Sequence, residues 1–326
     1  GSGSIEIANI LQYHKVSYLG VAYPDEGVEL RRNNISIPIM VMNPSEDSFE
    51  TMISYDLEPE IYSLKIFKAL IGLLDGRPCG IHLKLDTGMH RLGFEEADIT
   101  EVIVILKSNK NIKVASIFSH LAGADEATHD NFSQDQFHRF LTWAETISSS
   151  IGYKPLHHIL NSPGILRLPQ FQLDMVRIGI GLYGVDPTSE RFEKLRPVAT
   201  LKTIVSQVKH VKKGESIGYG RKGYAEKDST IATIAVGYAD GFSRAFSKGV
   251  GEVLIRGTRV KVIGNVCMDM TMIDVTNVDV VEGDEVILFG KDFPIQEIAS
   301  KINTIPYEIL TNTSERVKRI FTSGGI

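Results

Sequence analysis

The chain has few cysteines, a single tryptophan, and no long run of apolar residues. Its 326 residues contain 2 cysteines, Cys79 and Cys267, which lie far apart in the sequence. Two such cysteines cannot form a disulfide framework, and they fit a reducing compartment, for which the cytoplasm is the default. No apolar run approaches the roughly 20 residues that span a bilayer, so the sequence predicts no membrane segment.

Charge of one sign is also scarce. The 35 basic and 40 acidic side chains give a formal net charge of −5, without a basic stripe or a polybasic arm. This pattern argues against nucleic acid and a membrane surface as partners, and small molecules become the expected ligands. The histidines follow no metal-ligand spacing with the cysteines, so we expect no metal site.

The first part of the chain alternates short apolar runs with helical patterns, which is typical of parallel βα units. Seven strands are predicted, one short of the eight that close a (β/α)8 barrel. Either one strand escapes the pattern or the chain begins after it, and an open doubly wound sheet is the alternative. The predicted strands lie within 16–23, 37–42, 58–62, 80–86, 114–121, 157–161 and 175–182.

After about Leu195 the strands follow one another with only short turns, which predicts an antiparallel β domain. We therefore expect an α/β fold in which a TIM-like barrel precedes a mainly β domain. The predicted boundaries are 1–194 for the barrel domain and 195–326 for the β domain.

Polar side chains share one face of the strand at 80–86. Strand parity puts His82, Lys84 and Asp86 opposite three apolar residues. Polar groups near the carboxyl end of a barrel strand point to the mouth, where such folds keep their active sites. Lys84 and Asp86 are therefore site candidates, and a structural Lys–Asp pair is an equally good interpretation.

The strand predicted at 175–182 carries one charged residue, Arg177, beside Gly179 and Gly181. Glycines in a strand indicate close approach of a ligand or another backbone, or a barrel corner. Asn161 and Ser162 follow the preceding strand, and loops after the last two strands form the usual phosphate site of a barrel. The sequence thus indicates a phosphorylated ligand.

Several further motifs complete a resemblance. His120 ends a predicted strand, which alone favours a structural histidine, and tyrosines flanked by glycine occur at Tyr219 and Tyr238. Together with these, segments 84–93, 161–162, 176–180, 219–220, 236–241 and 267–269 make the chain resemble the alanine racemase family, in order and over nearly its whole length.

The resemblance implies a pyridoxal 5′-phosphate enzyme in which the protein tunes the cofactor as an electron sink. By this resemblance Arg177 donates a hydrogen bond to the pyridine nitrogen and leaves that nitrogen largely unprotonated. The phosphate is expected at Asn161 and Ser162 and at the backbone of Gly179 and Ile180.

The resemblance also implies substrate roles. Tyr219 is expected as the base on one face of the substrate Cα, with its phenol tuned through His120, which is linked to Arg177 in the family. Arg91 and Met268 are expected at the substrate, and Tyr238 near its access path. Lys84 is often carbamylated in relatives, and it would then orient Arg91.

Interconversion of L- and D-alanine for peptidoglycan, by a homodimer whose β domains lend Tyr219 and Met268 to the partner's barrel, follows from the same resemblance. The family's second base is a lysine that also forms the Schiff base with the cofactor, and we expect it just before Gly1. Segment 1–4 on composition alone reads as a leftover linker, whereas the resemblance favours a chain that starts past that lysine. Glu315 stands where many relatives have a phosphate-contacting tyrosine, so phosphate contact there is an open question.

Two alternatives remain. A decarboxylase of the same architecture would need an acid against the pyridine nitrogen, and Arg177 argues against it. A non-catalytic cofactor-binding or scaffolding fragment would follow if the chain is complete as given, because the lysine is not in it.

Overall fold

The computed structural model describes residues 1–188 and 195–322, which form two compact units. One unit is built mainly from Ser4–Leu182, and the other combines Gly1–Gly3 and Tyr183–Val185 with the chain from residue 195 onward. The predicted boundary at residue 194 lies outside the described residues. Below, the first unit is called the barrel domain and the second the β domain.

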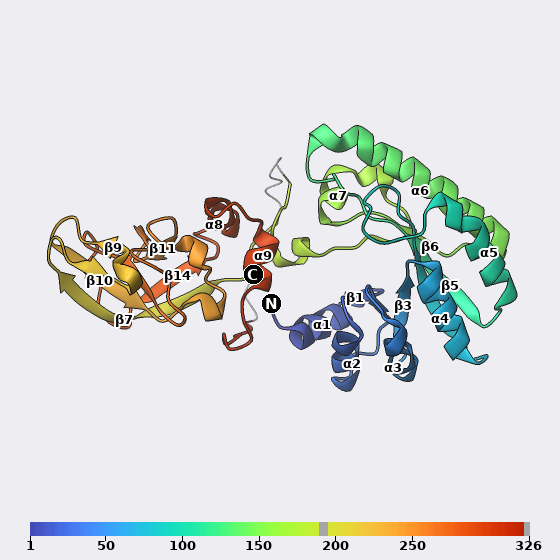
Figure 1. Cartoon of the computed structure of the whole chain (residues 1–326), viewed down its shortest axis with the longest axis horizontal. Helices are drawn as coiled ribbons and strands as arrows, with labels where there is room; N and C mark the ends of the chain where they lie inside the picture. The colour runs from blue at the N-terminus through green and yellow to red at the C-terminus, as the bar shows by residue number, and fades with distance from the viewer. Residues whose placement is uncertain (189–194, 323–326) are drawn as a thin grey trace. The chain divides into compact units, whose positions relative to one another are not determined.

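Parallel strands form the centre of the barrel domain, and helices surround them (Figure 1). Within the described residues the sheet has six strands in the order β1-β2-β3-β4-β5-β6. These strands are β1 Leu19–Val21, β2 Ile39–Val41, β3 Glu58–Ile61, β4 Cys79–Lys84, β5 Ile112–Phe118 and β6 Leu156–His158. The helices are α1 Ser4–Tyr13, α2 Pro24–Arg32, α3 Phe49–Ser54, α4 Leu64–Leu74, α5 Ile99–Ser108, α6 Asp130–Ile151 and α7 Ser162–Arg167. The predicted barrel-like α/β domain is confirmed.

Helix α4 shows how the sequence fixes these helices. The Ser63 hydroxyl accepts a hydrogen bond from the backbone N–H of Ile66, which satisfies one of the free donors at the helix start. Asp75 adopts a left-handed conformation directly after the helix and ends it. Between these ends, Phe67 and Leu70 are fully buried against the sheet at a helical spacing.

The prediction of a strand at 175–182 is wrong. The segment runs beside β6, with the N–H groups of Asp174 and Arg177 donating to the carbonyls of His157 and Leu160. It forms no regular ladder, and Ile180–Tyr183 is a short 3-10 helix. The reason is that the N–H groups of Gly179 and Gly181 donate to the Ser162 hydroxyl, not to a neighbouring strand.

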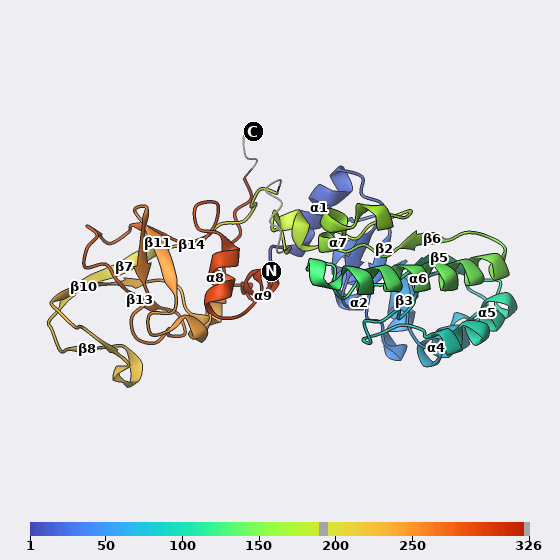
Figure 2. The same cartoon turned by 90° about the horizontal axis from the view of Figure 1, so that it is seen from above.

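The β domain contains a six-stranded antiparallel sheet among its described residues, in the order β12-β11-β14-β7-β10-β13. Its strands are β7 Leu201–Val211, β10 Ser229–Ile234, β11 Glu252–Ile255, β12 Thr258–Lys261, β13 Thr271–Asp274 and β14 Glu285–Phe289, with a small pair, β8 Ser216–Ile217 and β9 Gly223–Tyr224. Helices α8 Ile295–Lys301 and α9 Pro306–Thr311 follow. Figure 2 shows β8 at the end of this domain that is remote from α8.

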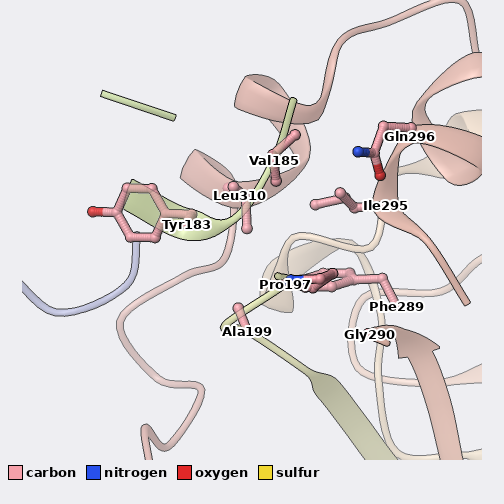
Figure 3. Close-up of a pocket in the computed structure, with 9 residues that line it drawn as sticks. All are labelled: Tyr183, Val185, Pro197, Ala199, Phe289, Gly290, Ile295, Gln296 and Leu310. Atoms are coloured by element: carbon pink, nitrogen blue, oxygen red, sulfur yellow. The ribbon is translucent and has the colours of Figure 1, made fainter. Parts of the chain in front are cut away.

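Two further features bear on function. Every helix in the described chain is too short or too polar to cross a bilayer. An apolar cavity at the base of the β domain, between Tyr183, Pro197, Ile295 and Leu310, measures about 10 Å³ (Figure 3). That volume holds one water at most, so this cavity is a packing gap and not a ligand site.

Candidate functional site

Arg177 is the central residue of the polar cluster in the barrel domain. Its Nη1 donates to Nδ1 of His158 at 2.6 Å, and its Nη2 donates to the carbonyls of Ser119 at 2.6 Å and Ile159 at 3.2 Å. Nη2 also donates to Nδ1 of His120 at 3.2 Å. The guanidinium carbon lies 5.0 Å from the centre of the Phe118 ring. The cation is therefore held from several strand ends at once.

The acceptors around this guanidinium are carbonyl oxygens and imidazole nitrogens, which carry no formal charge. Burial lowers the pKa of Arg177 to about 10, and Glu60 opposes this shift. The group stays protonated at neutral pH. Among the described residues, all hydrogen bonds of the guanidinium use Nη1 and Nη2, which leaves its Nε–H available to a further acceptor.

His120 lies next to Arg177, as the resemblance implied. Burial, with the positive charges of Arg177, Arg91 and Lys84, lowers the pKa of His120 to about 3. The imidazole is therefore neutral. Because its Nδ1 accepts from Arg177, its proton is on Nε2, so the 3.4 Å approach of Asn161 Nδ2 brings two donors together and is not a hydrogen bond.

Ser162 organises the loop after β6. Its Oγ accepts from the N–H groups of Gly179 at 2.9 Å and Gly181 at 3.3 Å. A Cβ added at Gly179 would meet nothing closer than Ser162 Oγ, at 3.9 Å, so open space lies beside this backbone. Asn161 accepts from Gly164 N–H and caps helix α7. The structure thus brings Asn161, Ser162 and Gly179 together, as the sequence predicts.

Lys84 and Glu60 form a buried pair in the barrel interior. Lys84 is 4% exposed, Glu60 is 0% exposed, and Lys84 Nζ lies 3.0 Å from Glu60 Oε1. Burial raises the pKa of Glu60, and the ammonium of Lys84 opposes that shift. The interior position of Lys84 confirms the strand parity, but its partner is not Asp86.

Asp86 caps its own loop and does not pair with Lys84, so the structural Lys–Asp pair is wrong and the site role of Asp86 stays a prediction. Its Oδ1 accepts from the N–H groups of Gly88, Met89 and His90, which closes the loop after β4. The returning chain requires glycine at Gly93, where a Cβ would lie 2.5 Å from the Asp86 nitrogen. Arg91 stands exposed on this loop, at a range where its charge acts on both Glu60 and His120.

Tyr219, Tyr238 and Met268 lie together in the β domain. They line a hollow of about 560 Å³ that is also lined by Arg244, Asn265, Met270 and neighbouring residues. Tyr219 is 75% exposed and Met268 is 53% exposed. The carbonyl of Tyr219 accepts from Asn265 Nδ2 at 3.2 Å, which holds the backbone while the phenol stays free to project.

Backbone contacts hold the other two residues of this hollow. The N–H of Tyr238 donates to the Cys267 carbonyl at 3.0 Å, and the N–H of Ala239 donates to the Met268 carbonyl at 3.0 Å. A Cβ at Gly237 would lie 2.3 Å from the Met268 oxygen, so only glycine permits this approach.

An arginine fastens the same turns to the C-terminal segment. Arg316 donates to Asp240 Oδ1 at 2.7 Å, and its Nη2 lies 2.7 Å from Asp269 Oδ1. The two carboxylates raise the pKa of Arg316. Glu315 is exposed beside it.

The predicted site residues thus fall into two groups, one in each domain. Sequence reasoning missed Glu60, His158 and His82, which complete the barrel group. The sequence could have indicated Glu60, because the short strand at 58–61 carries carboxylates at alternate positions, and buried carboxylates need partners. His158 gave no comparable signal, because adjacent histidines at 157 and 158 cannot be told apart by parity alone.

A barrel-like α/β domain with a polar cluster at its strand ends, joined to a mainly β domain, defines the class of two-domain barrel enzymes. Residues 1–187 match the family model described as "Alanine racemase, N-terminal domain", and residues 198–321 match "Alanine racemase, C-terminal domain". The chain belongs to the alanine racemase family.

Individual relatives agree with this assignment. An alanine racemase of Clostridium tetani is 38% identical over 337 residues, covering 100% of this chain and 87% of the relative. The solved alanine racemase of Clostridium difficile 630 superposes with a TM-score of 0.90 at 35% identity, covering 97% of this chain and 84% of that one. The structure from Bacillus anthracis with bound L-Ala-P gives a TM-score of 0.90 at 32% identity, with the same 97% and 84% coverage.

Proposed function

We propose that this protein is an alanine racemase that interconverts L- and D-alanine with pyridoxal 5′-phosphate. The observation that carries the proposal is Arg177, a partly buried cation whose hydrogen-bond partners carry no formal charge and whose Nε–H makes no hydrogen bond within the described chain. When bound, the cofactor supplies an electron sink for the electrons released at the substrate Cα.

The residues present fit that cofactor. The Nε–H of Arg177 is a donor suited to an aromatic nitrogen. The Ser162 hydroxyl and the backbone of Gly179 lie beside open space, as a phosphate group requires. We assign the pyridine nitrogen to Arg177 and the phosphate to Ser162, Gly179, Ile180 and the loop at Asn161.

Arg177 also determines the type of reaction. With a pKa of about 10, Arg177 keeps its proton at neutral pH, so it would hold the pyridine nitrogen by a hydrogen bond without protonating it. A cofactor held in this way would be a weaker electron sink, which suits proton exchange at Cα. A decarboxylase would instead benefit from an acid at this position, and an arginine stands there.

Tyr219 is our candidate for the base on one face of Cα. Its phenol is exposed beside the hollow that Tyr238 and Met268 also line. Exposed aromatic and methionine side chains around a hollow are typical of a surface that another chain covers. We therefore propose a homodimer in which this hollow closes over the partner's barrel.

Arg91 is our candidate for the substrate carboxylate, because it is an exposed cation on the loop after β4. Carbamylation of Lys84 stays a prediction from the family.

The test of the proposed function is direct. The purified protein, supplied with pyridoxal 5′-phosphate and L-alanine, is expected to form D-alanine until both enantiomers are equal, as followed with D-amino acid oxidase. Release of CO₂ without D-alanine would favour the decarboxylase instead. If the activity is present, supply of D-alanine to peptidoglycan in the cytoplasm is the expected role.

A further inference from the structure

A row of polar side chains crosses the interior of the barrel domain beneath Arg177. Ser116, His82 and His158 are each 0% exposed and come from the adjacent strands β5, β4 and β6. His158 Nε2 lies 2.9 Å from Ser116 Oγ, and Ser116 Oγ lies 2.6 Å from His82 Nδ1. His82 Nε2 then lies 2.8 Å from Glu58 Oε2 as an ion-pair contact, although the two atoms are not aligned for a hydrogen bond. In such a row of buried polar groups each hydrogen bond needs one donor and one acceptor, so the direction of one bond determines the direction of the next.

The direction of each hydrogen bond follows from the two ends. Arg177 has only donors, so His158 Nδ1 must accept from it and the proton of the neutral ring stands on Nε2. That Nε2–H donates to Ser116, which leaves the Ser116 hydroxyl proton to donate to His82 Nδ1. His82 then carries its own proton on Nε2, facing the carboxylate of Glu58.

We propose that Ser116 and His82 are positioning residues for Arg177, forming a one-way chain of donors that begins at this guanidinium and ends on His82, whose Nε2 faces Glu58. The inference rests on the proposed function, in which Arg177 holds the cofactor. The chain keeps His158 in the one tautomer that can accept from Nη1, and so it directs the remaining Nε–H of Arg177.

Charge supports this arrangement. A positive guanidinium stands at one end and a carboxylate at the other, with three groups between them that need no charge. Burial and the nearby positive charge of Arg177 lower the pKa of His158 well below its ordinary value, consistent with a neutral ring. The carboxylate end is anchored further, because burial and Glu58 together raise the pKa of Tyr18 to about 12, which keeps that phenol protonated as a donor.

The alternative is a protonated His82 that donates to both Glu58 and Ser116. In that case Ser116 would accept twice and the chain would have no direction. The two arrangements differ at one atom, since His82 Nδ1 is bare in the one-way chain and protonated in the alternative.

Nitrogen-15 NMR of the histidine-labelled protein decides between them without any activity measurement. We expect His82 and His158 both to carry a proton on Nε2 only. A proton on Nδ1 of either ring, or an imidazolium at His82, would overturn the proposal.

Two serine variants extend the test. Ser116→Ala is expected to shift the His158 and His82 ring nitrogens, whereas Ser133→Ala, which removes a buried hydroxyl on helix α6, is expected to leave them in place. Equal shifts in both variants, or none, would count against the chain. Should Ser116→Ala not fold, the tautomers of the unaltered protein still decide.

The holoenzyme gives the functional readout. Ser116→Ala is expected to lower kcat for racemisation by about tenfold, with KM within about twofold and cofactor still bound, since the two buried hydrogen bonds that Ser116 makes to His158 and His82 are lost. Ser116→Thr, which keeps the hydroxyl, is expected to recover most of that loss. Unchanged kcat in Ser116→Ala would refute the positioning role, whereas absence of racemisation in the unaltered protein with the expected tautomers would refute only the proposed function.

Discussion

The two polar clusters of this protein differ in burial and in how their side chains are held. In the barrel domain, Arg177, His158 and Lys84 are enclosed by strand ends, and neighbouring side chains or carbonyls engage them. In the β domain, Tyr219 and Met268 project from tight turns, and only their backbones are held.

This difference separates two tasks. Enclosed charges in a low-dielectric interior are held in one geometry, which suits the binding of a fixed cofactor. Exposed side chains on rigid turns suit a surface that becomes a site only when another surface meets it. The β-domain cluster is therefore the half whose removal should change turnover while leaving cofactor binding intact.

Replacing the Tyr219 phenol should have the largest effect. Tyr219→Phe removes the proposed proton acceptor but keeps the ring, and loss of a general base typically costs 10² to 10⁴ in rate. We expect kcat for racemisation to fall by about 10³ while cofactor absorbance stays unchanged. Tyr224→Phe, on the neighbouring strand β9 and outside the hollow, serves as the control. Full activity in Tyr219→Phe would remove this residue from the mechanism.

Crowding the turn beneath Tyr238 should disturb the exposed cluster through the backbone. Gly237→Ala places a Cβ 2.3 Å from the Met268 oxygen, so the turn at 267–268 must move. We expect a loss of about 2–4 kcal/mol in the free energy of unfolding, measured by urea titration. Gly72→Ala in α4 meets nothing within 4 Å and should instead stabilise by up to about 1 kcal/mol. Similar values for the two variants would contradict the close approach.

The enclosed cluster of the barrel domain should make the free energy of unfolding depend on pH. The folded protein keeps His120 neutral down to about pH 3, whereas the unfolded chain binds a proton near the ordinary value of 6.5. The unfolded state therefore binds more protons between these values, so stability falls as pH falls, by about 1.4 kcal/mol per unit for this group. Urea titrations between pH 6.5 and 4.5 should show a shallower loss in His120→Asn. An unchanged slope would mean that His120 is protonated in the folded protein.

The same contrast explains what the sequence could predict. Alternation of strands and helices predicted both domains, and strand parity placed Lys84 in the interior, because periodicity reports which face of a strand is buried. The resemblance supplied the order of the motifs. Neither periodicity nor motif order identifies which residue pairs with which across strands.

The differences between prediction and structure concern hydrogen-bond partners, which periodicity does not report. Asp86 has the right parity for the site, yet its carboxylate is used by the three N–H groups of its own loop. The strand predicted at 175–182 has the right alternation, but its N–H groups at Gly179 and Gly181 donate to the Ser162 hydroxyl and are not available for a strand ladder. Local competition for hydrogen bonds overrode the pattern in both cases.

The ion pairs around the exposed cluster should contribute least. Arg316 joins Asp240 and Asp269, but about half of its side chain is exposed, so water screens both contacts. We expect Arg316→Gln to lower the free energy of unfolding by less than about 1 kcal/mol, and high salt to reduce the difference further. Lys202→Gln, which removes an exposed pair with Glu285 on the same sheet, is the matched control. A loss several times larger in Arg316→Gln alone would mean that the turns carrying Tyr238 and Met268 depend on this arginine, and that the exposed half is organised by charge as well as by backbone.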